Sequence, residues 1–197
     1  MAGLIDEFMK NYGSEVTEHL SSNLNVDQGT VQKLIPKLAP LILSGLKVQK
    51  DTMGGDDRVD HILNKYGDSS VLNNIRDTIS SKTQDTTTDP NLGGLLGANG
   101  GIQAAQTLAK SLNIDPSTIM KMIPTLAPLL LGFLSKKRDT GGSGIKGISS
   151  MLDADSDGSI IDDVAGYLAK GGSATGTTRG KGKGILGSLL GGLTRRR

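Results

Sequence analysis

The sequence predicts an all-α protein, an internally duplicated helical domain with proline-kinked core helices and an acidic loop similar to that of an EF-hand. Three observations support this fold class. Apolar residues recur every three to four positions over long stretches, as expected of helices that bury one face. One stretch of 28 residues recurs 88 positions later with 14 identities. An Asp-x-Asp-x-Asp-Gly segment has the spacing of a calcium-binding loop between helices.

Each copy begins with an amphipathic helix. Its apolar side chains fall on one stripe, which is the pattern of a helix packed against a core along one side. In the first copy the stripe consists of Ile5, Phe8, Tyr12, Val16, Leu20 and Leu24. In the second copy it consists of Ile102, Ala105, Leu108 and Leu112.

The second helix of each copy is expected to begin after an aspartate. Asp27 and Asp115 are suited to this position, because a carboxylate accepts hydrogen bonds from the free amides of a first helical turn. Pro116 follows Asp115 directly, and proline is favoured at the first helical position. The same start is therefore predicted in both copies.

Two prolines, four residues apart, interrupt the apolar pattern of this second helix in each copy. Proline removes a backbone donor and kinks a helix, so we expect a bend or a break here. The bend could shape a groove or a hinge, or it could be a packing kink that lets small residues approach closely. The prolines are Pro36 and Pro40 in the first copy, and Pro124 and Pro128 in the second.

The repeat pairs Leu20–Lys47 with Leu108–Ser135, which divides the chain into four parts. Only two copies are present, so we expect a pseudo-symmetric pair rather than a solenoid. The predicted parts are helical repeat 1 (1–79), a polar and then glycine-rich linker (80–101), helical repeat 2 with the acidic loop (102–170), and a basic tail rich in glycine and leucine (171–197).

The acidic loop carries the strongest chemical signal. Ca²⁺ takes six to eight oxygen ligands, and aspartates at positions 1, 3 and 5 followed by glycine at position 6 supply three carboxylates and a sharp turn. Val164 stands at position 12, where a glutamate is expected, so an aspartate just before it must close the site. We expect bound Ca²⁺, with these ligands: Asp153, Asp155, Asp157, Ser159, Asp162 and Asp163.

The alternative for this loop is an acidic turn in which Asp162 and Asp163 precede and stabilise the next helix without a metal. The corresponding segment of the first copy, Asn64–Ile75, keeps only Asp68 at a ligand position. We therefore expect the first copy to keep the turn without the ion, which favours a structural ion over a signalling one.

The C-terminal segment has six basic residues and no acidic one from Gly171 onward, while the remainder has 16 basic and 20 acidic residues. Wound as a helix, its apolar residues form one stripe, which predicts a docking element. The alternatives are a solvated end, or a helix held at an anionic membrane surface. Nucleic acid is not expected, since no aromatic side chain lies between the basic ones. The docking residues are Ile185, Leu186, Leu189, Leu190, Leu193, Arg195, Arg196 and Arg197.

Composition excludes several classes of site. The absence of cysteine rules out disulfides, thiolate metal sites and a cysteine nucleophile. Only His19 and His61 are available, and no serine motif or phosphate-binding loop is present, so we expect no enzyme. The most apolar run, 119–134, is shorter than a membrane span and no signal sequence precedes it, so we expect a cytoplasmic protein. These criteria do not detect leaderless export.

The repeated Ile-Pro-x-Leu-Ala-Pro segment, the acidic loop and the basic glycine–leucine end together resemble a bacterial family known as domain of unknown function 937, whose relatives include YidB-like proteins. The resemblance implies a small helical protein with no assigned activity and no catalytic residues. We expect a non-enzymatic binding or assembly protein that joins a protein partner or its own copies, with no small-molecule substrate. The alternatives are a membrane-surface protein and a cation-dependent hydrolase that uses the acidic loop.

Overall fold

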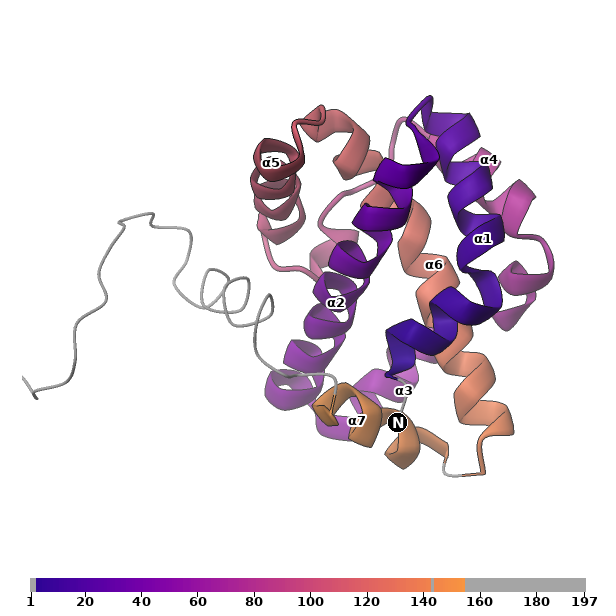
Figure 1. Ribbon diagram of the computed structural model, residues 1–197. Coiled ribbons are helices and arrows are strands. Elements are labelled where there is room, and N and C mark those ends of the chain that lie inside the picture. The colour runs from indigo at the N-terminus through magenta and orange to yellow at the C-terminus, as the bar shows by residue number, and fades with distance from the viewer. Residues whose placement is uncertain (1–2, 143, 155–197) are drawn as a thin grey trace, which may run out of the picture.

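The computed structural model describes residues 3–142 and 144–154, and these residues form helices without any strand (Figure 1). The all-α prediction is therefore confirmed. In chain order the elements are α1 (Leu4–Leu24), α2 (Gln28–Met53), α3 (Gly55–Tyr66), η1 (Ser69–Asn73), α4 (Ile75–Gln84), η2 (Leu92–Gly94), α5 (Gly100–Leu112), α6 (Pro116–Thr140) and α7 (Gly144–Ala154).

The same turn joins the first two helices in both copies. The C-cap residues that follow α1 and α5 are Asn25 and Asn113. Their φ angles are 52° and 54°, in the left-handed region. The next residue then donates its amide back across the turn, from Val26 to Ser21 (3.1 Å) and from Ile114 to Ala109 (3.0 Å). Asparagine tolerates this conformation, so a local signal ends both helices alike.

Both predicted aspartate caps are confirmed. Asp27 accepts hydrogen bonds from the amides of Gly29 (3.0 Å) and Thr30 (2.8 Å). Asp115 accepts one from the amide of Ser117 (2.7 Å). α2 and α6 therefore begin in the same way, 88 residues apart.

α2 and α6 continue through their prolines, so of the bend or break predicted there, the break does not occur. Each proline removes one backbone donor, while the apolar residues around it are fully buried and hold the helix in place. The Thr125 hydroxyl also donates to the Lys121 carbonyl (2.7 Å) in the turn that contains Pro124. Burial outweighs the local cost of the prolines here.

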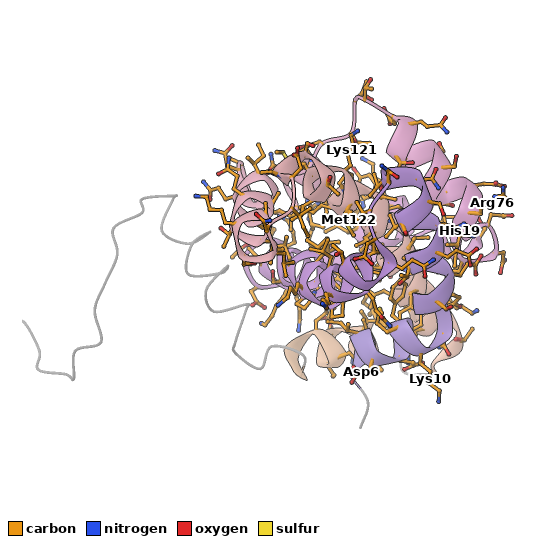
Figure 2. All side chains as sticks on the ribbon, turned by 45° about the horizontal axis from the view of Figure 1, so that its top comes forward. Asp6, Lys10, His19, Arg76, Lys121 and Met122 are labelled. Atoms are coloured by element: carbon orange, nitrogen blue, oxygen red, sulfur yellow. The ribbon has the colours of Figure 1, made fainter. Side chains whose placement is uncertain are left out.

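α6 lies at the centre of the molecule (Figure 1). It contacts α5 and α7 of its own copy, and also η1, α3 and α4 of the first copy. Met122 is fully buried, whereas the preceding Lys121 is exposed (Figure 2). Among the described residues α6 is long and apolar enough to cross a membrane, yet 72% of its most apolar window is buried within the protein.

Polar bridges join the two copies at matching places. Arg138 of α6 donates from Nη1 to Asp60 Oδ1 (2.8 Å) and to Asn64 Oδ1 (2.7 Å) of α3. Lys50, 88 positions before Arg138, donates from Nζ to the carbonyl of Ser149 in α7 (3.5 Å). The third helix of each copy is thus held by the second helix of the other.

The linker expected at 80–101 begins later in the structure. α4 extends to Gln84, because the side chains of its last turn bond back along the helix, Thr83 Oγ1 to the Ile79 carbonyl (2.8 Å) and Gln84 Nε2 to Ser80 Oγ (3.1 Å). α5 then starts two residues early, at Gly100. The segment between the two helices is therefore shorter than the predicted linker.

Candidate binding cleft between α1, α6 and α7

The start of α1, the end of α6 and α7 meet at one end of the molecule (Figure 1). They enclose a cleft of about 290 Å³. α1 contributes Glu7 and Tyr12, α6 contributes Phe133, Lys136 and Lys137, and α7 contributes Gly147, Ile148 and Met151.

An aromatic cluster forms the base of the cleft. The rings of Phe8 and Phe133 have centroids 5.6 Å apart and an interplanar angle of 65°, and those of Tyr12 and Phe133 are 5.9 Å apart at 75°. Edge-to-face pairs of this kind are favoured by the ring quadrupoles. Three of the five aromatic residues in the chain lie here, so aromatic side chains are concentrated at this end of the protein.

Charged groups surround this base unevenly. Lys137 Nζ forms an ion pair with Glu7 Oε2 (2.6 Å), and Lys136 Nζ donates to the Tyr12 hydroxyl (3.0 Å). The ammonium groups of Lys136 and Lys137 also lie 5.8 Å from the ring centroids of Tyr12 and Phe133, respectively. Two cations and one anion therefore leave this cleft with one net positive charge.

The corresponding place in the other copy is filled. The offset between the copies rises from 88 to 89 before the third helix, as in the pairing of Asn64 with Asp153, so Arg58 of α3 corresponds to Gly147 of α7. Its Nε and Nη2 donate to Gln49 Oε1 (3.0 and 2.8 Å). Gln49, which is 9% exposed, corresponds to Lys137. An arginine side chain thus occupies the position that glycine leaves vacant beside the cleft.

The packing at one further pair of corresponding positions differs between the copies as well. Gly45 of α2 corresponds to Phe133, and a Cβ at Gly45 would lie 2.7 Å from the Leu95 carbonyl oxygen and 2.8 Å from Leu96 Cδ2. The backbone before α5 therefore comes close to α2. On the cleft side the Phe133 ring of α6 packs instead against the rings of Phe8 and Tyr12 in α1.

The exposure of two corresponding residues reflects this difference. Met151 of α7 is 37% exposed at the cleft, whereas its counterpart Ile62 of α3 is 5% exposed. The sequence analysis did not predict the cleft. The sequence signal for it was the exchange of Arg58 for Gly147 and of Val48-Gln49 for Lys136-Lys137 between the copies. The packing of the helices shows that these positions lie together at one end of the molecule.

The predicted calcium loop lies almost entirely outside the described residues. Asp153 falls in the last turn of α7. The other ligands, and the docking residues of the tail, lie beyond it: Asp155, Asp157, Ser159, Asp162, Asp163, Ile185, Leu186, Leu189, Leu190, Leu193, Arg195, Arg196 and Arg197. Within residues 3–142 and 144–154, no group of three or more His, Cys, Asp or Glu side chains could hold a metal ion.

The equivalent turn of the first copy is described. Asp68 precedes η1 and accepts hydrogen bonds from the amide (2.8 Å) and the hydroxyl (2.7 Å) of Ser70. These two hydrogen bonds hold the pKa of Asp68 below its ordinary value, and the one from the hydroxyl contributes more than the one from the amide. This carboxylate caps the turn, so the prediction that the first copy keeps the turn is confirmed.

The histidines form no catalytic dyad in the described structure. His61 is exposed on α3, and its neighbour Asp60 is engaged by Arg138 and by Asn64 Nδ2 (2.9 Å). His19 is half-buried on α1. Neither histidine lines the cleft.

Comparison with known proteins identifies a family. The family described as "Bacterial protein of unknown function (DUF937)" matches residues 6–137 and, in a second match, 101–197. Because the matches cover well over half of the sequence, the chain belongs to this family. The two overlapping matches also agree with the duplication inferred from the repeat. No curated protein and no solved structure matches the chain.

Proposed function

We propose that the chain is a non-enzymatic binding protein that holds a partner protein, or a second copy of itself, at the cleft between α1, α6 and α7. One observation carries the proposal. The two copies have diverged at this place, where Gly147 stands opposite an aromatic base in one copy and Arg58 fills the space in the other. A concave surface with apolar walls and a few convergent polar groups is the usual form of a binding site.

The acidic loop and the basic tail extend this proposal. Ca²⁺ at Asp153–Asp163 would stabilise the second copy, whose third helix forms one wall of the cleft. The tail would supply a second docking element on the same chain. Both features belong to the proposal as sequence-based predictions, because their residues lie outside the described part of the protein.

The test is to fill the cleft as the first copy fills it. Gly147→Arg places an arginine at the position of Arg58, in the interior of α7, where it is a better helix former than glycine. The variant should keep its melting temperature and lose partner proteins that copurify with the wild type, or lose concentration-dependent self-association in sedimentation velocity.

Lys146→Arg is the matched control. It lies next to Gly147 on α7 and is exposed, so it adds bulk without lining the cleft. It should behave as the wild type does in both assays. If Gly147→Arg retains every partner and the same oligomeric state, the cleft is not the binding surface and the proposal is wrong.

A further inference from the structure

The positive charge of the cleft is centred on Lys136. The neighbouring Lys137 is neutralised by Glu7 at 2.6 Å, whereas Lys136 has the Tyr12 hydroxyl as its hydrogen-bond partner and no carboxylate within the described ranges. The other copy carries the uncharged Val48 and Gln49 at these two positions. A free ammonium group therefore accompanies the open cleft and is absent where the cleft is closed.

The net charge of the cleft sets which anion matches it. Glu7 and Lys137 form an ion pair at 2.6 Å, so these two side chains together add no net charge. Lys136 supplies the one remaining positive charge. A lysine ammonium acts as a point charge, and one carboxylate neutralises it.

Apolar side chains in the cleft lining favour a ligand that carries an apolar group beside its anion. Ile148 and Met151 of α7 face the cleft opposite the Phe133 ring. Methionine is flexible and polarisable, so it adapts to ligands of different shape. The cleft of about 290 Å³ lies at the lower limit of small-molecule sites, which are about 300–1,000 Å³. It has space for the end of a ligand rather than for a whole cofactor.

We infer that the cleft binds the C-terminal residue of a partner polypeptide, with its carboxylate on Lys136 and its apolar side chain against Phe133, Ile148 and Met151. A chain end brings a monoanion and an apolar group together on one residue, which matches the size and charge of the cleft. Capture of a terminal carboxylate is a known mode of peptide recognition. The inference rests on the proposed function and specifies the ligand of the same site.

Matched probes separate the carboxylate from the apolar group. The full-length protein, labelled on its isoleucine and methionine methyl groups, is titrated in NMR with N-acetyl-L-leucine, N-acetyl-L-phenylalanine, their primary amides, and the peptide acetyl-Gly-Ser-Gly-Ser-Gly-Phe. The acids and the peptide should shift the Ile148 and Met151 signals. The amides should bind at least about tenfold more weakly, which corresponds to about 1.4 kcal/mol.

Two variants locate the charge. Lys136→Gln should lower the affinity for the acids to that of the amides, while Lys110→Gln, at an exposed position of α5, should leave it unchanged. Equal binding of acid and amide, or an unchanged affinity in Lys136→Gln, would overturn the assignment of a carboxylate to Lys136.

The remaining outcomes are also decisive. If the N-acetyl amino acids bind and the peptide does not, the ligand is a small carboxylic acid and the polypeptide assignment is wrong. If none of the probes shifts these signals, the C-terminal ligand is excluded. The proposed function fails separately, when Gly147→Arg retains all partners, so a protein that passes that assay and fails this one binds a different ligand at the cleft.

Discussion

At the scale of single residues, Asp27 and Asp115 show how one side chain sets the start of a long helix. The Thr30 hydroxyl, followed by the amides of Gly29 and Thr30, holds the pKa of Asp27 below its ordinary value. Hydrogen bonds from the Ser117 hydroxyl, which contributes most, and from the Ser117 amide likewise lower the pKa of Asp115. Both carboxylates are solvent-exposed, so their effect is local to the first turn.

These caps predict a loss of stability in acid. A carboxyl group whose pKa is lower in the folded state stabilises the fold above its unfolded pKa of about 3.9, and this contribution disappears as the pH falls through the folded pKa. An asparagine side chain at either position would cap the helix without titrating. The double variant Asp27→Asn/Asp115→Asn should therefore lose less stability than the wild type between pH of about 5 and about 2.

Urea unfolding at several pH values measures this difference. The variant should match the wild type closely near neutral pH, where both side chains accept the same hydrogen bonds. An identical acid-induced loss in the two proteins would show that the caps do not contribute to the pH dependence.

The acidic loop predicts a calcium-dependent melting temperature. Binding to the folded state alone would stabilise it by about 2.7 kcal/mol when free Ca²⁺ is 100 times its dissociation constant. The melting temperature should rise from chelator to millimolar Ca²⁺, and Asp155→Ala/Asp157→Ala should abolish the rise.

Asp68→Ala is the control for this experiment. Asp68 caps η1 in the equivalent turn of the first copy. Its removal should lower the melting temperature equally with and without Ca²⁺. A wild-type melting temperature that is the same in chelator and in Ca²⁺ would leave the loop as an acidic turn.

At the scale of elements, a glycine allows α6 and η1 to come into close contact, because it has no side chain between them. A Cβ at Gly132 of α6 would lie 2.7 Å from the Asp68 carbonyl oxygen and 2.8 Å from Val71 Cγ2. The backbone around η1 therefore lies directly on α6. The corresponding residue of α2 is Ser44.

Gly132→Ala should destabilise the protein by about 1–3 kcal/mol, because the added methyl group must displace backbone in a packed interior. Gly29→Ala is the matched control, since the nearest atom to its Cβ would be Asp27 Oδ1 at 3.4 Å. Glycine to alanine within a helix should stabilise by about 0.5–1 kcal/mol where space allows. Equal effects of the two substitutions on urea unfolding would contradict the predicted overlap at Gly132.

At the scale of the whole molecule, the two copies share one apolar core. Buried residues from α1 through α7 form a single cluster. α4 belongs to the first copy, yet it packs against α6 of the second as well as against α1. Neither copy can bury its apolar faces alone.

This interlocking predicts a single cooperative unfolding transition. Hydrogen exchange measured by mass spectrometry at increasing urea should show that amides in the middle of α2 and of α6 lose protection at the same concentration. The reason is that opening either helix exposes the same cluster. Two separate transitions, one for each copy, would show that the halves are stable independently.

The candidate site shows the limit of local patterns. The exchanges of Val48-Gln49 for Lys136-Lys137 and of Arg58 for Gly147 can be read when the alignment of the two copies is extended past Lys47 and Ser135, with an offset of 88 and then 89. Nothing in that alignment says that Tyr12 lies beside Phe133. The distance between two segments far apart in the sequence depends on how all the helices pack.

Local patterns were enough to predict the helical class, the repeat, the two aspartate caps and the turn at Asp68. The caps and the turn rest on hydrogen bonds within a few residues, and the period of apolar residues indicates helices, so neighbouring residue types suffice. The unbroken proline-containing helices, the packing of α4 on α6 and the cleft at one end of the molecule followed only from the packed fold. Those outcomes depend on burial and close packing between distant segments, which can outweigh local preference.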